Sequence, residues 1–168
     1  MFRKPLLIVS LLFLQNVAIA GTDPTLPEGV HVIKQEIFLS GTPREDTFRE
    51  MAQAGVRIAV DLREPEEIQG FEKRAAQRNG ITYYSAPISR VGDLQQAQIE
   101  AVDRIVAQRQ GLKIWVYCNS GNRAASWMTI HLAKTQGMKA DDAIAEAKHL
   151  GLNKEEMVTK VRAFLQRK

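Results

Sequence analysis

The chain has 168 residues, of which 45% are hydrophobic and 25% are charged, with a formal net charge of +4 and a single cysteine. This balance indicates a globular domain, because a disordered chain would be poorer in apolar residues and more one-sided in charge. One cysteine excludes an internal disulfide and a four-cysteine zinc site within this sequence. The lone thiol therefore needs an explanation of its own.

Residues 1–20 have the three-part pattern of a secretory signal peptide. Arg3 and Lys4 precede an apolar run over residues 6–14, and the small residues Ala18 and Ala20 predict cleavage after Ala20. The apolar run is shorter than the roughly 20 residues that span a bilayer, which favours cleavage over a retained anchor. The 148 residues that remain would carry a formal net charge of +2. We therefore expect a secreted or periplasmic protein without stable membrane anchoring after cleavage.

The remaining basic residues are interleaved with acidic ones, as in Arg44-Glu45-Asp46, which is typical of a solvated surface. Nucleic acid is therefore not predicted as a partner. His31, His131 and His149 are far apart in the sequence and lack the spacing of paired metal ligands. We expect no metal site and no cofactor, and the sequence leaves the oligomeric state open.

Patterns of apolar residues predict strands that alternate with helices. A flexible segment at 21–29 precedes one or two short strands in 30–39, a helix over 45–54 that ends at Gly55, a strand over 56–62, a helix over 66–78, a strand over 81–85, a loop over 86–93, a helix over 94–108, a strand over 113–117, and helices over 123–135, 140–149 and 154–166. This order predicts an α/β fold, with a central, mostly parallel sheet flanked by helices, in one domain over residues 30–168.

Cys118 directly follows a predicted strand, Asn119-Ser120-Gly121-Asn122 forms a tight loop, and a helix begins at Arg123. Backbone N–H groups of such a loop and of the helix start converge on one point and bind an anion. The same positive field stabilises a thiolate at Cys118, which makes it a nucleophile. Arg123 adds a planar fork for two phosphate oxygens, and Gly121 permits close backbone approach.

This six-residue loop resembles those of cysteine-dependent protein tyrosine phosphatases and of rhodanese sulfurtransferases. Further pieces are similar to a bacterial phosphatase-like family that also occurs fused to β-lactamase-like hydrolases: Ser40-Gly41-Thr42-Pro43, Ala54-Gly55-Val56, Asp61-Leu62-Arg63, Glu66 and Gly80-Ile81. The resemblance implies a cysteine-dependent phosphatase-like fold and hydrolysis of phosphate esters. It also implies Cys118 as nucleophile, with Asn119, Ser120, Gly121, Asn122 and Arg123 binding a phosphorylated small molecule or protein.

Three departures from the phosphatase pattern leave two alternatives. Four residues rather than the common five separate Cys118 from Arg123, Ala124 stands where many loops carry a hydroxyl residue, and Tyr117 stands where phosphatases usually have His. The short loop, and the similarity of residues 61–67 to an acidic turn of rhodaneses, favour a sulfurtransferase with a persulfide on Cys118. Loss of the hydroxyl residue and of the His favours a catalytically silent anion-binding module.

A phosphatase needs a general acid for the leaving oxygen, and in the resembling enzymes this is an Asp upstream of the cysteine loop. Asp93 is the candidate, and its alternative role is N-cap of the helix that follows. Asp61 and Arg63 close a strand, where they either orient the loop region or form a surface ion pair. Trp127 and Met128 are predicted to lie in the core.

Overall fold

The structure is a computed structural model that describes residues 26–167, and within these residues five strands form one sheet in the order β1-β2-β5-β3-β4. Strands β2, β5, β3 and β4 are parallel, and β1 pairs antiparallel with β2. The bounds are β1 His31–Ile33, β2 Ile37–Ser40, α1 Glu45–Gln53, β3 Val56–Asp61, η1 Pro65–Glu67, α2 Glu72–Arg78, β4 Thr82–Ser85, α3 Gln96–Ala107, β5 Lys113–Tyr117, α4 Asn122–Thr135, α5 Ala140–His149 and α6 Glu155–Gln166. The predicted α/β class with a mostly parallel sheet is confirmed, whereas the predicted signal peptide at 1–20 lies outside the described residues.

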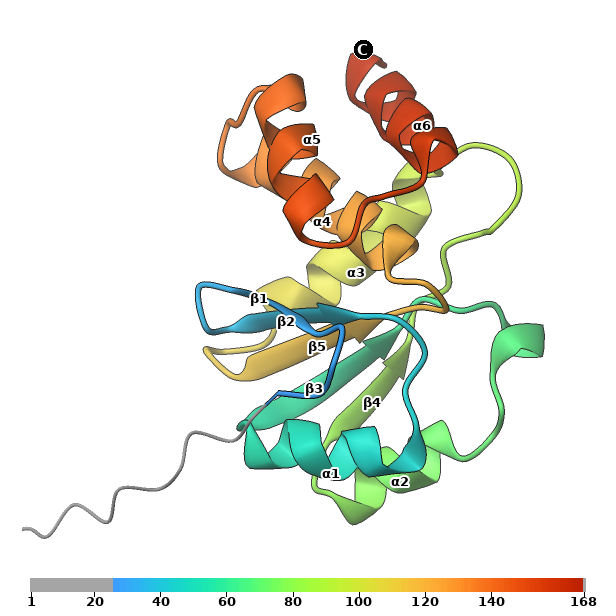
Figure 1. The fold of residues 1–168 in the computed structure, drawn as a ribbon, viewed down its shortest axis with the longest axis vertical. Coiled ribbons are helices and arrows are strands. Elements are labelled where there is room, and N and C mark those ends of the chain that lie inside the picture. The colour runs from blue at the N-terminus through green and yellow to red at the C-terminus, as the bar shows by residue number, and fades with distance from the viewer. Residues whose placement is uncertain (1–25, 168) are drawn as a thin grey trace, which may run out of the picture.

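Helices cover both faces of the sheet, with α1 and α2 on one side and α3 to α6 on the other (Figure 1). Side chains of β5 alternate between the two sides, as the pleat of a strand requires. Trp115 and Tyr117 join the core under α1 and α2, whereas Val116 and Cys118 join the larger core under α4. In that larger core Trp127 and Met128 are buried, as predicted.

The candidate functional loop, residues 118–123, follows β5, the central strand of the sheet. In the registers of the parallel ladders, Tyr117 at the end of β5 lies opposite Ser40 of β2 and Asp61 of β3. Since parallel strands end at the same edge, the segments that follow β2, β3 and β5 come together there. The backbone N–H of Cys118 donates to the Ser40 carbonyl at 3.3 Å, which fixes the thiol at this edge.

The predicted helix over 66–78 is wrong, because the structure divides this segment. A short 3-10 turn, η1, ends before Ile68, whose backbone is extended (ψ 128°), and Gly70 has a φ of 87°. Only glycine adopts that φ without strain, so the chain turns there and α2 begins at Glu72. The break lets Glu67 and Glu72 reach different partners.

The predicted N-cap role of Asp93 is also wrong. Helix α3 begins at Gln96, and the residue at its N-cap position is Gln95, which makes no side-chain capping bond. The carboxylate of Asp93 instead accepts a hydrogen bond from Arg167.

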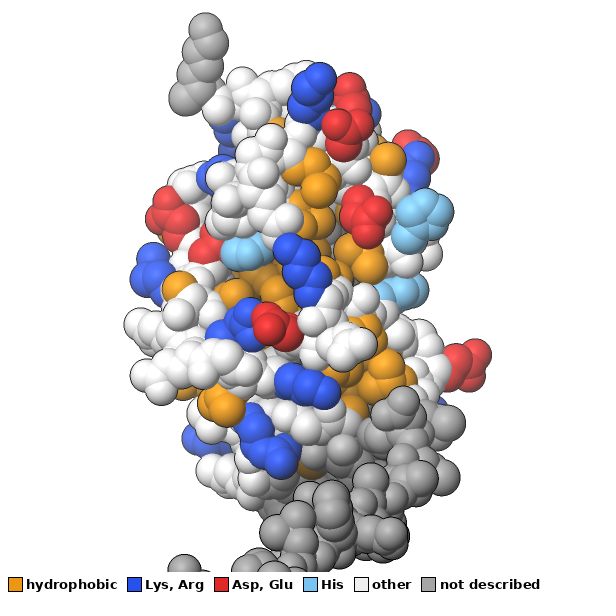
Figure 2. Space-filling model, turned by 90° about the vertical axis from the view of Figure 1, so that its left-hand side faces the viewer, with side chains coloured by type: hydrophobic (Ala, Val, Ile, Leu, Met, Phe, Trp, Pro, Cys, Tyr) orange, Lys and Arg blue, Asp and Glu red, His pale blue; other side chains and the backbone are white. Residues whose placement is uncertain are grey.

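On the face in Figure 2, basic and acidic side chains are interspersed, in keeping with the interleaved charges of the sequence. Within the described part of the chain, no helix has the length and apolar character that crossing a membrane requires.

Candidate active site

The loop after β5 presents unbonded backbone donors beside the start of α4. Gly121, with a φ of 79°, occupies the N-cap position of α4, and no side chain caps this helix. Among the described residues, the backbone N–H groups of Asn119 and Ser120 also have no hydrogen-bond partner. Donors at a helix start that nothing else satisfies form a site for an anion. The predicted arrangement of strand, loop and helix is confirmed.

Residues after β2 support this loop from one side. The backbone N–H and the hydroxyl of Thr42 both donate to the Asn119 carbonyl, each at 3.0 Å. A Cβ on Gly41 would lie 3.0 Å from that same carbonyl oxygen, which is tighter than nine in ten such contacts. The resemblance of residues 40–43 to the phosphatase-like family thus falls on a segment that touches the functional loop.

The guanidinium of Arg123 is held in place beside the thiol, with the side chain 7% exposed. Its Nη1 and Nη2 donate to the two oxygens of Glu67, both at 2.8 Å, and Nη1 also donates to the carbonyls of Leu62 and Ile88. Burial opposes the charged form, but the Glu67 carboxylate and the Cys118 sulfur together raise the pKa of Arg123 above its ordinary value. Arg123 therefore stays positively charged next to Cys118, which is itself fully buried.

Glu67 connects the arginine to the loop, a role that its sequence context alone does not predict. Besides Arg123, its carboxylate accepts from the Asn119 side chain at 2.5 Å and from the Glu64 backbone N–H at 2.8 Å. Burial alone would raise the pKa of Glu67, but the hydrogen bonds from Arg123 and from the Glu64 backbone, together with the charges of Arg123 and Arg90, lower it. One sequence signal could have pointed to Glu67, namely its place in an acidic turn directly after a strand. Turns that follow neighbouring parallel strands lie at the same edge of the sheet, so this turn meets the loop after β5.

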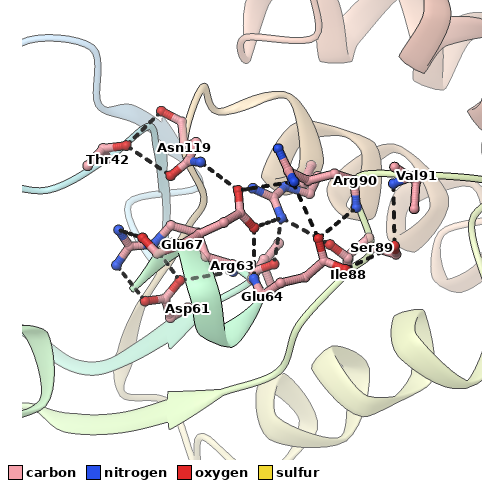
Figure 3. Close-up of polar contacts among 12 residues, drawn as sticks. Thr42, Asp61, Arg63, Glu64, Glu67, Ile88, Ser89, Arg90, Val91 and Asn119 are labelled. Carbon is pink, nitrogen blue, oxygen red and sulfur yellow. Dashed lines mark hydrogen bonds and ion pairs between the residues drawn. The ribbon is translucent and has the colours of Figure 1, made fainter. Parts of the chain in front are cut away.

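Glu64 of the same acidic turn holds the loop that leads to α3. It accepts from the Ser89 hydroxyl at 3.1 Å and from the Arg90 backbone N–H at 3.3 Å, and the Arg90 side chain lies 3.5 Å from it (Figure 3). Arg90 Nε is also 3.7 Å from Glu67. The structure therefore adds a second arginine beside Arg123, one that no sequence motif indicated.

Asp61 and Arg63 form a buried cluster, so the alternative of a surface ion pair is wrong. Arg63 donates to both oxygens of Asp61, at 2.9 and 2.7 Å, and to Glu72 at 2.7 Å, and all three side chains are fully buried. The Tyr83 hydroxyl donates to Asp61 at 3.1 Å. Although burial opposes its charge, bonds to Asp61 and Glu72 raise the pKa of Arg63. Arg63 Nη1 also reaches the Glu67 carbonyl at 3.4 Å, which links this cluster to the acidic turn.

Asp93 lies apart from this constellation. Its side chain is 68% exposed and pairs with Arg167 Nη2 at 2.9 Å. The pocket of about 260 Å³ that Arg123 lines also holds two carboxylates, Glu67 and Glu156, but not Asp93. Within residues 26–167, no group of three or more His, Cys, Asp or Glu side chains is arranged to hold a metal ion.

No family model matches the chain. The "Beta-lactamase hydrolase-like protein" of two Xylella fastidiosa strains is 30% identical over 118 residues, which are 67% of this chain. The chain spans only about a quarter (27%) of the length of these relatives.

Several solved phosphatase structures have a similar fold. Tk-PTP in its active form has a TM-score of 0.72 at 19% identity, over 83% of this chain and 97% of that one. The core catalytic domain of the PP-IP phosphatase SIW14 from S. cerevisiae has a TM-score of 0.68 at 20% identity, over 81% and 85%. TpbA of P. aeruginosa in complex with pTyr has a TM-score of 0.65 at 17% identity, over 87% and 86%.

These comparisons confirm the predicted resemblance to the phosphatase-like group at the level of the fold. The chain has the fold of protein-tyrosine-phosphatase-like phosphatases and shares sequence with a β-lactamase hydrolase-like protein. The rhodanese-like features inferred from the sequence are not confirmed, because the solved structures named above are phosphatases.

Proposed function

We propose that this protein is a cysteine-dependent phosphatase that hydrolyses phosphate esters. The observation that carries the proposal is Arg123, which the Glu67 carboxylate holds beside Cys118 in a bidentate ion pair. The charged guanidinium of Arg123 is held in position beside the thiol and the unbonded backbone donors. Together these groups can bind a phosphoryl group while the thiol attacks it. That one similar structure contains pTyr and another is named a PP-IP phosphatase supports phosphate esters as the substrate class.

In the proposed reaction the Cys118 thiolate attacks phosphorus, forming an S–P bond while the P–O bond of the ester breaks. Loop N–H groups and the two Arg123 donors without a partner among the described residues, Nε–H and the second Nη2–H, bind the phosphoryl oxygens, where negative charge is concentrated. Water then attacks the cysteinyl phosphate, which releases inorganic phosphate and restores the thiolate. Two easier steps replace one difficult displacement.

We assign the general acid to Asp93, which would give its proton to the leaving oxygen. Glu67 and Glu156 line the pocket, but the pKa of each lies below its ordinary value, because of hydrogen bonds and Arg123 for Glu67 and because of Lys160 for Glu156. Carboxylates that stay ionised are poor proton donors. Asp93 lies on the loop that Glu64 ties to the acidic turn, and its pair with Arg167 must open before it can act.

The test compares two reactions of the mature protein, which we propose is exported and begins at Gly21. We expect phosphate release from an aryl phosphate, and no thiocyanate from thiosulfate plus cyanide. If thiocyanate forms and no phosphate is released, the protein is a sulfurtransferase and the phosphatase proposal is wrong. If the protein binds phosphate but supports neither reaction, it is a silent anion-binding module.

Replacing Asp93 with Asn is expected to lower kcat by about a hundredfold for an ester with a poor leaving group, such as phenyl phosphate. For p-nitrophenyl phosphate, whose leaving group needs little protonation, the loss should be much smaller. Steady-state kinetics with the two esters measures both losses.

Asp141→Asn is the matched control, because Asp141 is 79% exposed and forms a comparable surface pair with Arg162. It should leave kcat for both esters unchanged. If Asp93→Asn lowers kcat equally for the two esters, Asp93 is not the general acid.

A further inference from the structure

The pocket beside the functional loop carries an excess of positive charge that the proposed attack on phosphate does not use. Three cations line it, namely Arg90, Arg123 and Lys154. Arg123 is neutralised by Glu67, and Arg90 lies within 3.7 Å of Glu64 and Glu67. Among the described residues, Lys154 has no ion-pair partner within 4.0 Å, although Glu156 lines the same pocket and pairs instead with Lys160. Lys154 is therefore available to an anionic ligand.

Lys154 is held against the functional loop through its backbone. Asn122, which is 3% exposed, accepts hydrogen bonds through Oδ1 from the backbone N–H groups of Asn153 and Lys154, both at 3.0 Å. Its Nδ2 donates to the Asn153 side chain at 2.9 Å. Asn122 directly precedes Arg123, so one buried carboxamide sets the position of Lys154 relative to the phosphate-binding arginine. The segment before α6 thus forms a fixed wall of the site.

The lining of the pocket also indicates what kind of molecule it takes. None of the described residues that line it is aromatic, and Met157 is the apolar contributor among polar and charged side chains. Aromatic and apolar walls are what usually bind a flat aryl group. A pocket of about 260 Å³ with polar walls instead suits a small polar ester.

We propose that Lys154 is a specificity residue that binds a second anionic group of the substrate, next to the phosphate that Cys118 attacks. The preferred substrate class is then a compact, non-aromatic phosphate ester that carries a second phosphate or a carboxylate. Arg90, on the opposite loop, faces the same pocket and adds to its positive field. This inference rests on the proposed phosphatase function and extends it to substrate choice.

The experiment measures phosphate release from two matched pairs of esters. Fructose 1,6-bisphosphate is compared with fructose 6-phosphate, and 3-phosphoglycerate with glycerol 3-phosphate, so the two pairs separate a second phosphate from a carboxylate. In the wild type we expect a higher kcat/KM for the member with the second anion. In Lys154→Gln this preference should fall about fivefold, mainly through KM, which is the size expected of one charge contact at an exposed site.

Lys139→Gln is the matched control. Lys139 is also exposed and also stands at the N-cap of a C-terminal helix, α5, but it does not line the pocket. Lys139→Gln removes the same charge from the protein and should leave the preference for the ester with a second anion unchanged. High salt should weaken the preference of the wild type, because ions screen exposed charges. Equal preferences in wild type and Lys154→Gln would overturn the proposal.

A binding measurement separates the phosphatase mechanism from the proposed role of Lys154. In the Cys118→Ser background, calorimetry with fructose 1,6-bisphosphate should show binding about fivefold weaker when Lys154→Gln is added, as for one exposed charge contact. If turnover depends on Cys118 but Cys118→Ser binds the bisphosphate equally well with and without Lys154→Gln, only the role of Lys154 is overturned. Turnover that Cys118→Ser leaves intact would overturn the phosphatase mechanism, while a binding loss in Lys154→Gln would still support the anion subsite.

Discussion

Replacing Cys118 with Ser is expected to lower kcat for phosphate ester hydrolysis by at least about a thousandfold, because the attacking thiolate is removed. A serine hydroxyl in the same place keeps its proton near neutral pH and is a much weaker nucleophile. The donors that bind the phosphoryl oxygens, Arg123 and the loop N–H groups, remain in place. Phosphate affinity should therefore stay within a few-fold of the wild type. Phosphate release and calorimetric phosphate binding measure the two quantities.

Because Cys118 is fully buried, its replacement must be shown not to disturb the fold. Ser126→Ala is a suitable comparison, since Ser126 is equally buried on α4 and its hydroxyl has no hydrogen-bond partner among the described residues. It should retain wild-type turnover and thermal stability. Turnover of Cys118→Ser above a tenth of the wild-type rate would exclude Cys118 as the nucleophile.

Replacing Arg63 with Met is expected to lower the free energy of unfolding by about 3–5 kcal/mol, because it leaves two buried carboxylates without their cation. Asp61 and Glu72 are both fully buried and both bonded to this guanidinium. Among the described residues, Glu72 Oε2 already has no hydrogen-bond partner. Urea unfolding of wild type and variant measures the difference.

Arg78→Met is the matched control, since Arg78 pairs with Glu45 at a position where both side chains are about 60% exposed. Water solvates an exposed carboxylate that loses its partner, so this change should cost less than about 1 kcal/mol. Adding Glu72→Gln to Arg63→Met should recover part of the lost stability, because one buried charge is removed. A cost for Arg63→Met no larger than that for Arg78→Met would contradict the buried-charge argument.

Strands and helices with a single strong pattern could be predicted from the sequence alone. The patterns of residues 113–117 and 140–149 predict the same bounds that the structure gives β5 and α5. The segment over 66–78 could not, because its apolar spacing fits a continuous helix and the turn at Gly70 depends on where Glu67 and Glu72 find partners. Local pattern is a weak guide where tertiary contacts decide the backbone.

The loop at 118–123 could be identified because neighbours in the sequence supply its whole chemistry. A thiol, free N–H groups, a permissive Gly121 and Arg123 all lie within six residues of one strand end. The partners that orient this chemistry lie 56 residues upstream at Glu67 and 31 residues downstream at Asn153. No local pattern links residues at such separations.

The sequence by itself thus determined the α/β class, the lone thiol and the order of strand, cysteine loop and helix around it, because periodicity and short motifs report local backbone structure. The signal peptide over 1–20, the Asp93 acid and the domain limits at 30–168 stay predictions. Only the tertiary structure decided that Glu67 fixes Arg123, that Asp61 and Arg63 are buried, and that Asn122 presents Lys154 to the pocket. The physical reason is that the parallel strands β2, β5 and β3 end at one edge and bring distant segments into contact.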